Sequence, residues 1–138
     1  MSKERDEILL TSFPDASRGN LFVGEAARQI PFPIKRFYVL TDIPSRETVR
    51  GGHAHKRMEQ VMFCVRGSCL MRMDDGENKW TVLLDTPSTG IRIRSNIWHD
   101  FTECSKDTVV LVVASEYYDE VDYIRDYEAF LRLVTKGA

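Results

Sequence analysis

The stretch Arg50-Gly51-Gly52-His53-Ala54-His55-Lys56 holds two of the three histidines of the chain and leads into an apolar run that reaches Val65. This run predicts a strand, in which residues at i and i+2 point to the same face. We therefore expect His53 and His55 to project together into one cavity. The two glycines beside them permit a tight turn or a close approach of a ligand to the backbone.

Similar strand-like runs lie on both sides of the histidine stretch and are separated by turn residues. Asp74-Asp75-Gly76-Glu77 predicts a hairpin turn between two of these runs. Residues 1–19 are polar and end in a turn composition, so no strand is predicted there. Frequent turns and little helical periodicity before residue 115 predict an antiparallel sandwich or barrel. The other expected strands are 20–23, 36–40, 68–73, 79–84, 91–93 and 108–114.

The last segment has a helical period. From Asp119 onward, large apolar residues recur at spacings of three and four, which predicts an amphipathic helix; they are Tyr123, Tyr127, Phe130 and Val134. The expected fold is therefore all-β, an antiparallel barrel with a short C-terminal helix. With no linker or repeat in sight, residues 1–138 are expected to form a single domain.

Composition narrows the function classes. The chain has 138 residues, 43% hydrophobic and 29% charged, with a net charge of -2. A slightly negative net charge does not favour binding of nucleic acid or of an anionic membrane by the protein as a whole. No apolar run approaches the ~20 residues of a membrane span. Three cysteines without paired spacing predict free thiols and a cytoplasmic location.

Three histidines and one carboxylate have the residue types of a metal site. His53, His55, Glu59 and His99 would suit zinc, iron, nickel or manganese, and strand alternation places the first three on one face if no bulge intervenes. The plainer alternative is a hydrogen-bonded histidine pair with Glu59 paired to a neighbouring cation. The spacing alone leaves metal binding, metal-free catalysis and a purely structural pair open.

Proton transfer beside a carbonyl is the other available chemistry. A histidine can take a proton and return it, as an enolisation requires. Tyr38, on one face of its strand with Arg36, can hydrogen-bond the oxygen that gains charge. Arg18, Arg36 and Arg50 are candidates to hold an anionic group such as a diphosphate.

Several motifs in order give the chain a family resemblance. From Asp15 to about Val134 it resembles the cupin-fold sugar nucleotide 3,4-ketoisomerases, which act on TDP-4-keto-6-deoxy-D-glucose. The matching pieces are Asp15-Ala16-Ser17-Arg18-Gly19, Ile30-Pro31-Phe32, Ile34-Lys35-Arg36, Arg50-Gly51-Gly52-His53-Ala54-His55-Lys56, Gly67-Ser68, Asp74-Asp75-Gly76, Trp98-His99 and the run from Ala114 to Arg125. The segment Arg94-Ser95-Asn96 departs from the family, whose members commonly carry Pro and Gly there, and Asp100 stands where Glu is frequent.

The resemblance implies a jelly-roll barrel, a homodimer that exchanges N-terminal strands, and catalysis without metal or cofactor. His53 matches the catalytic base, Tyr38 the active-site tyrosine and His55 the second active-site histidine, which is expected to contact substrate. In this scheme His53 removes the C3 proton, an enediol forms and a proton returns at C4. Tyr38 and His99 are expected to handle the C4 proton and hydroxyl, and Arg18, Arg36 and Arg50 to bind substrate.

The resemblance also implies a product. Relatives with Arg before the glycine of the N-terminal turn and His after the Trp resemble enzymes that form TDP-3-keto-6-deoxy-D-galactose. This chain has Arg18-Gly19 and Trp98-His99, so the galacto product is expected. Such a product leads to a TDP-linked 3-amino-3,6-dideoxy sugar, for example of an O-antigen or lipopolysaccharide. The rival hypotheses are a metal-dependent cupin enzyme and a non-catalytic sugar-nucleotide-binding barrel.

Overall fold

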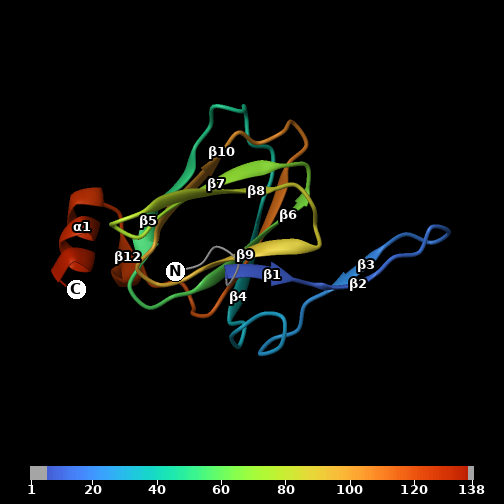
Figure 1. The fold of residues 1–138 in the computed structure, drawn as a ribbon, viewed down its shortest axis with the longest axis horizontal. Coiled ribbons are helices and arrows are strands. Elements are labelled where there is room, and N and C mark those ends of the chain that lie inside the picture. The colour runs from blue at the N-terminus through green and yellow to red at the C-terminus, as the bar shows by residue number, and fades with distance from the viewer. Residues whose placement is uncertain (1–5, 137–138) are drawn as a thin grey trace.

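Two five-stranded sheets make up most of the computed structural model, which describes residues 6–136 (Figure 1). The strand order is β1-β9-β6-β11-β4 in the first sheet and β12-β5-β10-β7-β8 in the second, and β2 and β3 form a separate hairpin. The elements are β1 (Glu7–Leu9), β2 (Thr11–Phe13), β3 (Leu21–Val23), β4 (Arg36–Leu40), β5 (Arg50–His55), β6 (Gln60–Arg66), β7 (Cys69–Asp74), β8 (Lys79–Leu84), β9 (Thr89–Ile93), β10 (Trp98–Thr102), β11 (Val109–Ala114), β12 (Tyr123–Ile124) and α1 (Tyr127–Lys136).

The all-β prediction with a short C-terminal helix is confirmed. Neighbouring strands of both sheets pair antiparallel. In the described part of the chain the two sheets share no ladder, so the jelly roll is not closed into a barrel, which is consistent with the predicted cupin-like fold. Alternate residues of β6 and β7 fill the space between the sheets, including Met62, Cys64, Cys69 and Met71. The cysteines are free and buried, as predicted.

The histidine run divides into two strands that belong to different sheets. β5 ends at His55 and β6 begins at Gln60, so the prediction of one strand reaching Val65 is wrong. The carboxylate of Asp122 causes this break, because it accepts the backbone N–H groups of Arg57 at 2.8 Å and Met58 at 3.1 Å. Backbone groups bonded to a side chain in this way cannot extend the β5 ladder.

A bulge interrupts the pairing of β5 with β10. His53 lies opposite His99 and Gly51 opposite Asp100, so Gly52 is an extra residue without a partner. Gly51 has φ 95° and Gly52 φ 83°, which glycine adopts without strain. A Cβ on Gly51 would also lie 3.1 Å from the carbonyl oxygen of His99, so the close strand approach requires glycine there.

Short strands without a clear apolar period were missed by the sequence pattern. The polar N-terminal segment contributes β1, which pairs with β9, and β2, which pairs with β3. β10 was also missed, although it is central to the second sheet. The β2–β3 hairpin projects away from the two sheets, and its connecting turn lies at the far end (Figure 1).

The C-terminal helix begins later than predicted. Asp119 caps a 3₁₀ turn of Glu120–Asp122, and β12 follows, so residues 119–124 are not part of the helix. β12 pairs with β5, where Tyr123 lies opposite His55. α1 then buries Phe130 completely against the outer side of this strand pair. Across residues 6–136 no helix is both long and apolar enough to span a membrane.

Candidate active site

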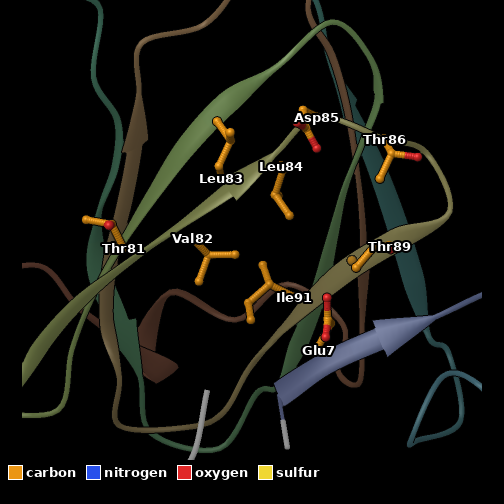
Figure 2. Close-up of a pocket in the computed structure, with 10 residues that line it drawn as sticks. Glu7, Thr81, Val82, Leu83, Leu84, Asp85, Thr86, Thr89 and Ile91 are labelled. Carbon is orange, nitrogen blue, oxygen red and sulfur yellow. The ribbon is translucent and has the colours of Figure 1, made fainter. Parts of the chain in front are cut away.

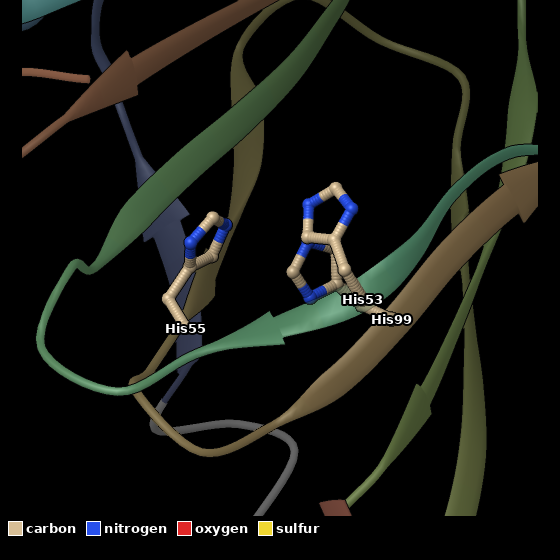
Figure 3. Close-up of side chains that lie close together, drawn as sticks. All are labelled: His53, His55 and His99. Atoms are coloured by element: carbon tan, nitrogen blue, oxygen red, sulfur yellow. The ribbon is translucent and has the colours of Figure 1, made fainter. Parts of the chain in front are cut away.

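All three histidines of the chain converge between the two sheets (Figure 3). His53 and His55 extend from β5 and His99 from β10. The ring centroid of His53 lies 4.9 Å from that of His55 and 4.9 Å from that of His99, both in edge-to-face geometry. The prediction that His53 and His55 share one face is confirmed, and the β5–β10 pairing adds His99 to them. The chamber beside this cluster is lined by His53 and His99 but not by His55, so the two β5 histidines do not both line one cavity.

A small chamber of about 80 Å³ lies beside His53 and His99. It is lined by Tyr38, Leu40, Arg50, Gly51, His53, Gln60, Met62, Ile93, His99, Phe101 and Val112. Larger hollows lie elsewhere, such as the one of about 370 Å³ between β8, β9 and β1 (Figure 2), but its lining residues include no histidine. The chamber is the candidate active site because imidazole and phenol groups meet there. Its size admits only part of a ligand.

Burial keeps the imidazoles neutral. The pKa values of His53 and His55 fall to about 3, chiefly because burial disfavours the charged ring and then because His99 lies close. Burial also lowers the pKa of His99. A neutral imidazole has a free lone pair at physiological pH, so His53 is in the form that a general base requires.

This protonation state predicts a flat pH profile. We expect kcat/KM to stay constant from pH 8 down to about pH 5, since a lowered pKa leaves His53 unprotonated in this range. The acid limb of the profile is expected only below that. Steady-state kinetics across the range, with circular dichroism to monitor folding, provides the measurement. A midpoint near 6.5, the ordinary histidine value, would contradict the assignment.

The imidazole rings of His99 and His55 differ in their hydrogen bonds. Nδ1 of His99 lies 3.0 Å from the carbonyl oxygen of Ile97; because a carbonyl only accepts, this nitrogen carries the proton and Nε2 is left as the acceptor. Both ring nitrogens of His55 are buried without a hydrogen-bond partner. Asp122 Oδ2 lies 3.8 Å from His55 Nδ1, which is too far for a hydrogen bond.

Tyr38 lines the chamber from the opposite sheet, and Arg36 lies beside it on the same face of β4, as predicted from the alternation, but is not part of the chamber lining. Burial raises the pKa of Tyr38, so its phenol keeps its proton. The Arg36 guanidinium lies 5.1 Å above the Tyr38 ring and 5.5 Å from the Tyr118 ring, and its Nη1 is buried without a partner. Gln60 Nε2 donates to the Tyr38 hydroxyl at 2.9 Å. Gln60 was missed, because one glutamine beside an apolar run has no sequence signal.

Tyr123 forms one wall of the histidine cluster and was also missed as a site residue. Its ring centroid lies 5.0 Å from that of His53 and 4.3 Å from that of His55, and the Arg125 guanidinium lies over the ring, 4.4 Å from its centroid. Glu120 pairs with Arg125 at 2.6 Å. The helical spacing had assigned Tyr123 to packing, whereas its position in β12 opposite His55 places it in the site.

Two predicted residues lie apart from the cluster. The carboxylate of Glu59 accepts a hydrogen bond of 2.7 Å from Arg92, so the rival hypothesis of a metal set of three histidines and one glutamate does not hold for its fourth member. The three imidazoles alone have ligand atoms within 4.8 Å of one another and are a suitable donor set for a divalent transition metal. Arg18 is exposed and pairs with Asp15 in the β2–β3 turn.

A family model described as "FdtA: WxcM-like, C-terminal" matches residues 4–135. The chain belongs to this family. A relative, the TDP-4-oxo-6-deoxy-alpha-D-glucose-3,4-oxoisomerase of Aneurinibacillus thermoaerophilus, is 44% identical over 120 residues, which cover 87% of this chain and 86% of the relative. A 3,4-ketoisomerase from Helicobacter canadensis has a similar structure, with a TM-score of 0.89, 39% identity and coverage of 94% and 96% of the two chains.

The QdtA 3,4-ketoisomerase of Thermoanaerobacterium thermosaccharolyticum is a further structural relative of this WxcM-like chain. Its complex with TDP was solved for a double mutant in which a tyrosine became arginine and an arginine became histidine; the TM-score is 0.91, with 37% identity and coverage of 95% and 94%. A histidine-to-asparagine mutant of the same enzyme was solved with TDP-4-keto-6-deoxyglucose.

Proposed function

We propose that this protein converts TDP-4-keto-6-deoxy-D-glucose to TDP-3-keto-6-deoxy-D-galactose. Its class is that of the TDP-sugar 3,4-ketoisomerases, in agreement with the 44% identical relative and the solved neighbours. The observation that carries the proposal is the meeting of a neutral His53 with Tyr38 and His99 in one small chamber. The chamber accepts the reacting edge of a sugar, while the nucleotide remains outside it.

The reaction moves two hydrogens and no net charge. His53 takes the proton from C3, which the C4 carbonyl makes acidic, and the electron pair forms a C3–C4 double bond. The C4 oxygen gains negative charge and takes the phenol proton of Tyr38, which gives the enediol and a phenolate. The C3 hydroxyl proton then returns to the Tyr38 oxygen as the C3 carbonyl forms, and C4 receives the proton that His53 took, relayed on the His99 side of the chamber.

The configuration at C4 depends on the face from which this proton arrives. His99 lines the chamber and has an unprotonated Nε2, so its ring can accept a proton and pass it on, whereas an arginine stays charged and is a poor acid. The QdtA double mutant carries the two residue types that this chain has at Arg18 and His99. This correspondence supports the proposal that the pair directs formation of the galacto product.

Arg18 can take part only if another subunit brings it to the site. The β2–β3 hairpin projects from the sheets of its own protomer (Figure 1). Phe13 and Leu21 on this hairpin, which we call the arm, are largely exposed, and an apolar groove of about 410 Å³ lies on the outer face of the first sheet. Exposed apolar surface of this kind is typical of an interface. We propose a homodimer in which the arm of one subunit brings Arg18 to the partner's chamber.

Arg36 and Arg50 are proposed to hold the diphosphate at the chamber entrance. We expect Arg50→Ala and Arg36→Met each to weaken TDP binding by ~10- to 100-fold, as for loss of a hydrogen bond to a charged group. The effect should shrink at high salt. Calorimetric titration with TDP measures it. Arg66→Met is the control, because Arg66 pairs with Asp107 at the opposite end of β6; equal affinity in all variants would contradict the assignment.

Metal independence is the next prediction. The three imidazoles favour a metal-dependent isomerase as the second candidate function, since they would suit Zn²⁺. We nevertheless expect full activity after prolonged dialysis against a chelator, because acid–base groups suffice for the proposed steps. Metal content by mass spectrometry accompanies the assay. Activity lost on chelation and restored by one divalent ion would establish the metal-dependent alternative.

The deciding experiment is incubation of the purified protein with TDP-4-keto-6-deoxy-D-glucose, followed by proton NMR of the product. A 3-keto sugar with an axial C4 hydroxyl is expected. An unchanged substrate despite tight binding would favour the non-catalytic sugar-nucleotide-binding barrel. We also propose that an aminotransferase later converts the product to a 3-amino-3,6-dideoxy sugar of a surface glycan. The proposed location of the protein is the cytoplasm.

A further inference from the structure

Gln60 lies on the chamber wall beside Tyr38 and is 1% exposed. It is the first residue of β6, and its backbone is held between β9 and β11, opposite Ile93 and Ala114. A buried polar side chain in an otherwise apolar strand is costly unless it is hydrogen-bonded. Its Nε2 makes such a bond, donated to the Tyr38 hydroxyl oxygen at 2.9 Å.

This bond determines where the phenol proton of Tyr38 can point. A phenol has one O–H donor, and its oxygen accepts the bond from Gln60, so the proton must be directed away from the amide. Arg36, which lies over the Tyr38 ring, has only donors and cannot accept that proton. Within residues 6–136 no protein acceptor is bonded to the Tyr38 hydroxyl. The proton is therefore left for a group inside the chamber.

We propose that Gln60 is a positioning residue for the chemistry at C4. Its amide holds the Tyr38 oxygen so that the phenol O–H is aimed at the C4 oxygen of the bound sugar as negative charge develops there. This inference rests on the proposed ketoisomerase function and adds a residue that acts through the Tyr38 hydroxyl. Donors fixed in advance toward a developing oxyanion lower the barrier because no reorganisation is needed during the reaction.

Two substitutions at Gln60 distinguish the effect of its N–H donor from the effect of its size and shape. Gln60→Met keeps the length and fills the space but removes the amide, so we expect kcat to fall ~10-fold or more. That loss is smaller than the ~10²–10³ that follows loss of an oxyanion donor itself. Gln60→Glu replaces the donor with an acceptor that draws the Tyr38 proton away from the chamber, and should lower kcat further. In both variants TDP affinity should stay within about twofold, since Gln60 lies inside the chamber and the nucleotide is bound outside it.

The decisive readout is a double-mutant cycle with Tyr38→Phe. If Gln60 acts only through the Tyr38 hydroxyl, Gln60→Met should cause no further loss of kcat once that hydroxyl is gone. Gln29→Met is the matched control, because Gln29 is a glutamine that donates to Thr11 in the N-terminal region. Thermal melts monitor the folding of every variant.

The outcomes distinguish this inference from the proposed function. A wild-type protein without turnover overturns the ketoisomerase assignment and, with it, the role of Gln60. If the wild-type protein turns over substrate, two results would overturn the positioning role alone. One is an unchanged kcat in Gln60→Met, and the other is an equal loss of kcat from Gln60→Met in the wild-type and Tyr38→Phe backgrounds. A loss confined to the background that retains the Tyr38 hydroxyl supports it.

Discussion

His53→Asn is expected to lower kcat by at least ~10²–10⁴-fold while the affinity for TDP remains within a few-fold of wild type. Asparagine has a similar size and can hydrogen-bond, but it has no group that accepts a proton from C3. His53 is only half-buried, next to His55, His99 and Tyr123, so the substitution removes ring contacts without leaving a buried charge. Binding and chemistry should therefore separate in this variant.

Hydrogen exchange at C3 provides the second readout for His53→Asn. In D₂O the wild-type protein should introduce deuterium at C3 of recovered substrate, because proton removal precedes the rest of the reaction. The variant should show no such exchange. Near-normal turnover, or exchange that persists at the wild-type rate, would remove His53 from the role of base. Melting temperature and TDP titration serve as controls for folding.

The double substitution Arg18→Tyr with His99→Arg is expected to change the product from the galacto to the gluco configuration at C4. His99 is buried beside His53, and its Nε2 is the free acceptor of the ring. Arginine at this position cannot relay a proton, so protonation must come from another direction. The coupling constant between H4 and H5 in the proton NMR spectrum of the product reports the configuration directly.

The single substitution Arg18→Tyr tests whether a second subunit takes part in directing the protonation. Arg18→Tyr changes a residue that is exposed in its own protomer, so an effect on the product requires the arm of a second subunit. Mixing Arg18→Tyr subunits with His53→Asn subunits should then restore some wild-type chambers. A gluco product from the unmodified protein would refute the assignment, and an unaltered galacto product from the double variant would show that other groups direct the protonation.

Alternation along strands predicted much of the site from sequence. His53 and His55 on β5, and Arg36 and Tyr38 on β4, are two apart and share a face, as expected. The position of His99 opposite His53 was not predictable, because β10 has no apolar period and its pairing depends on the other strands. Residue type and the family resemblance made His99 a candidate, but neither gave its position opposite His53.

The missed features share a physical cause, which is that tertiary contacts override local periodicity. Tyr123 fits a helical spacing, yet the capped turn at Asp119 and the pairing with His55 draw it into β12. Glu59 fits strand alternation, yet the backbone N–H groups before it donate to the Asp122 carboxylate and end β5. The Glu59 side chain pairs with Arg92 instead. In both cases a side chain distant in the sequence decides the local conformation.

The glycine bulge in β5 has a consequence for how such a site can change. In a regular strand, residues separated by an odd number of positions face opposite ways. Because Gly52 is unpaired, Arg50 lies opposite the buried Phe101 and lines the chamber with His53, although the two are three residues apart. The extra residue of the bulge thus places the cation Arg50 and the base His53 on the same face of β5. Deletion of one glycine would turn Arg50 outward without altering any residue that carries chemistry.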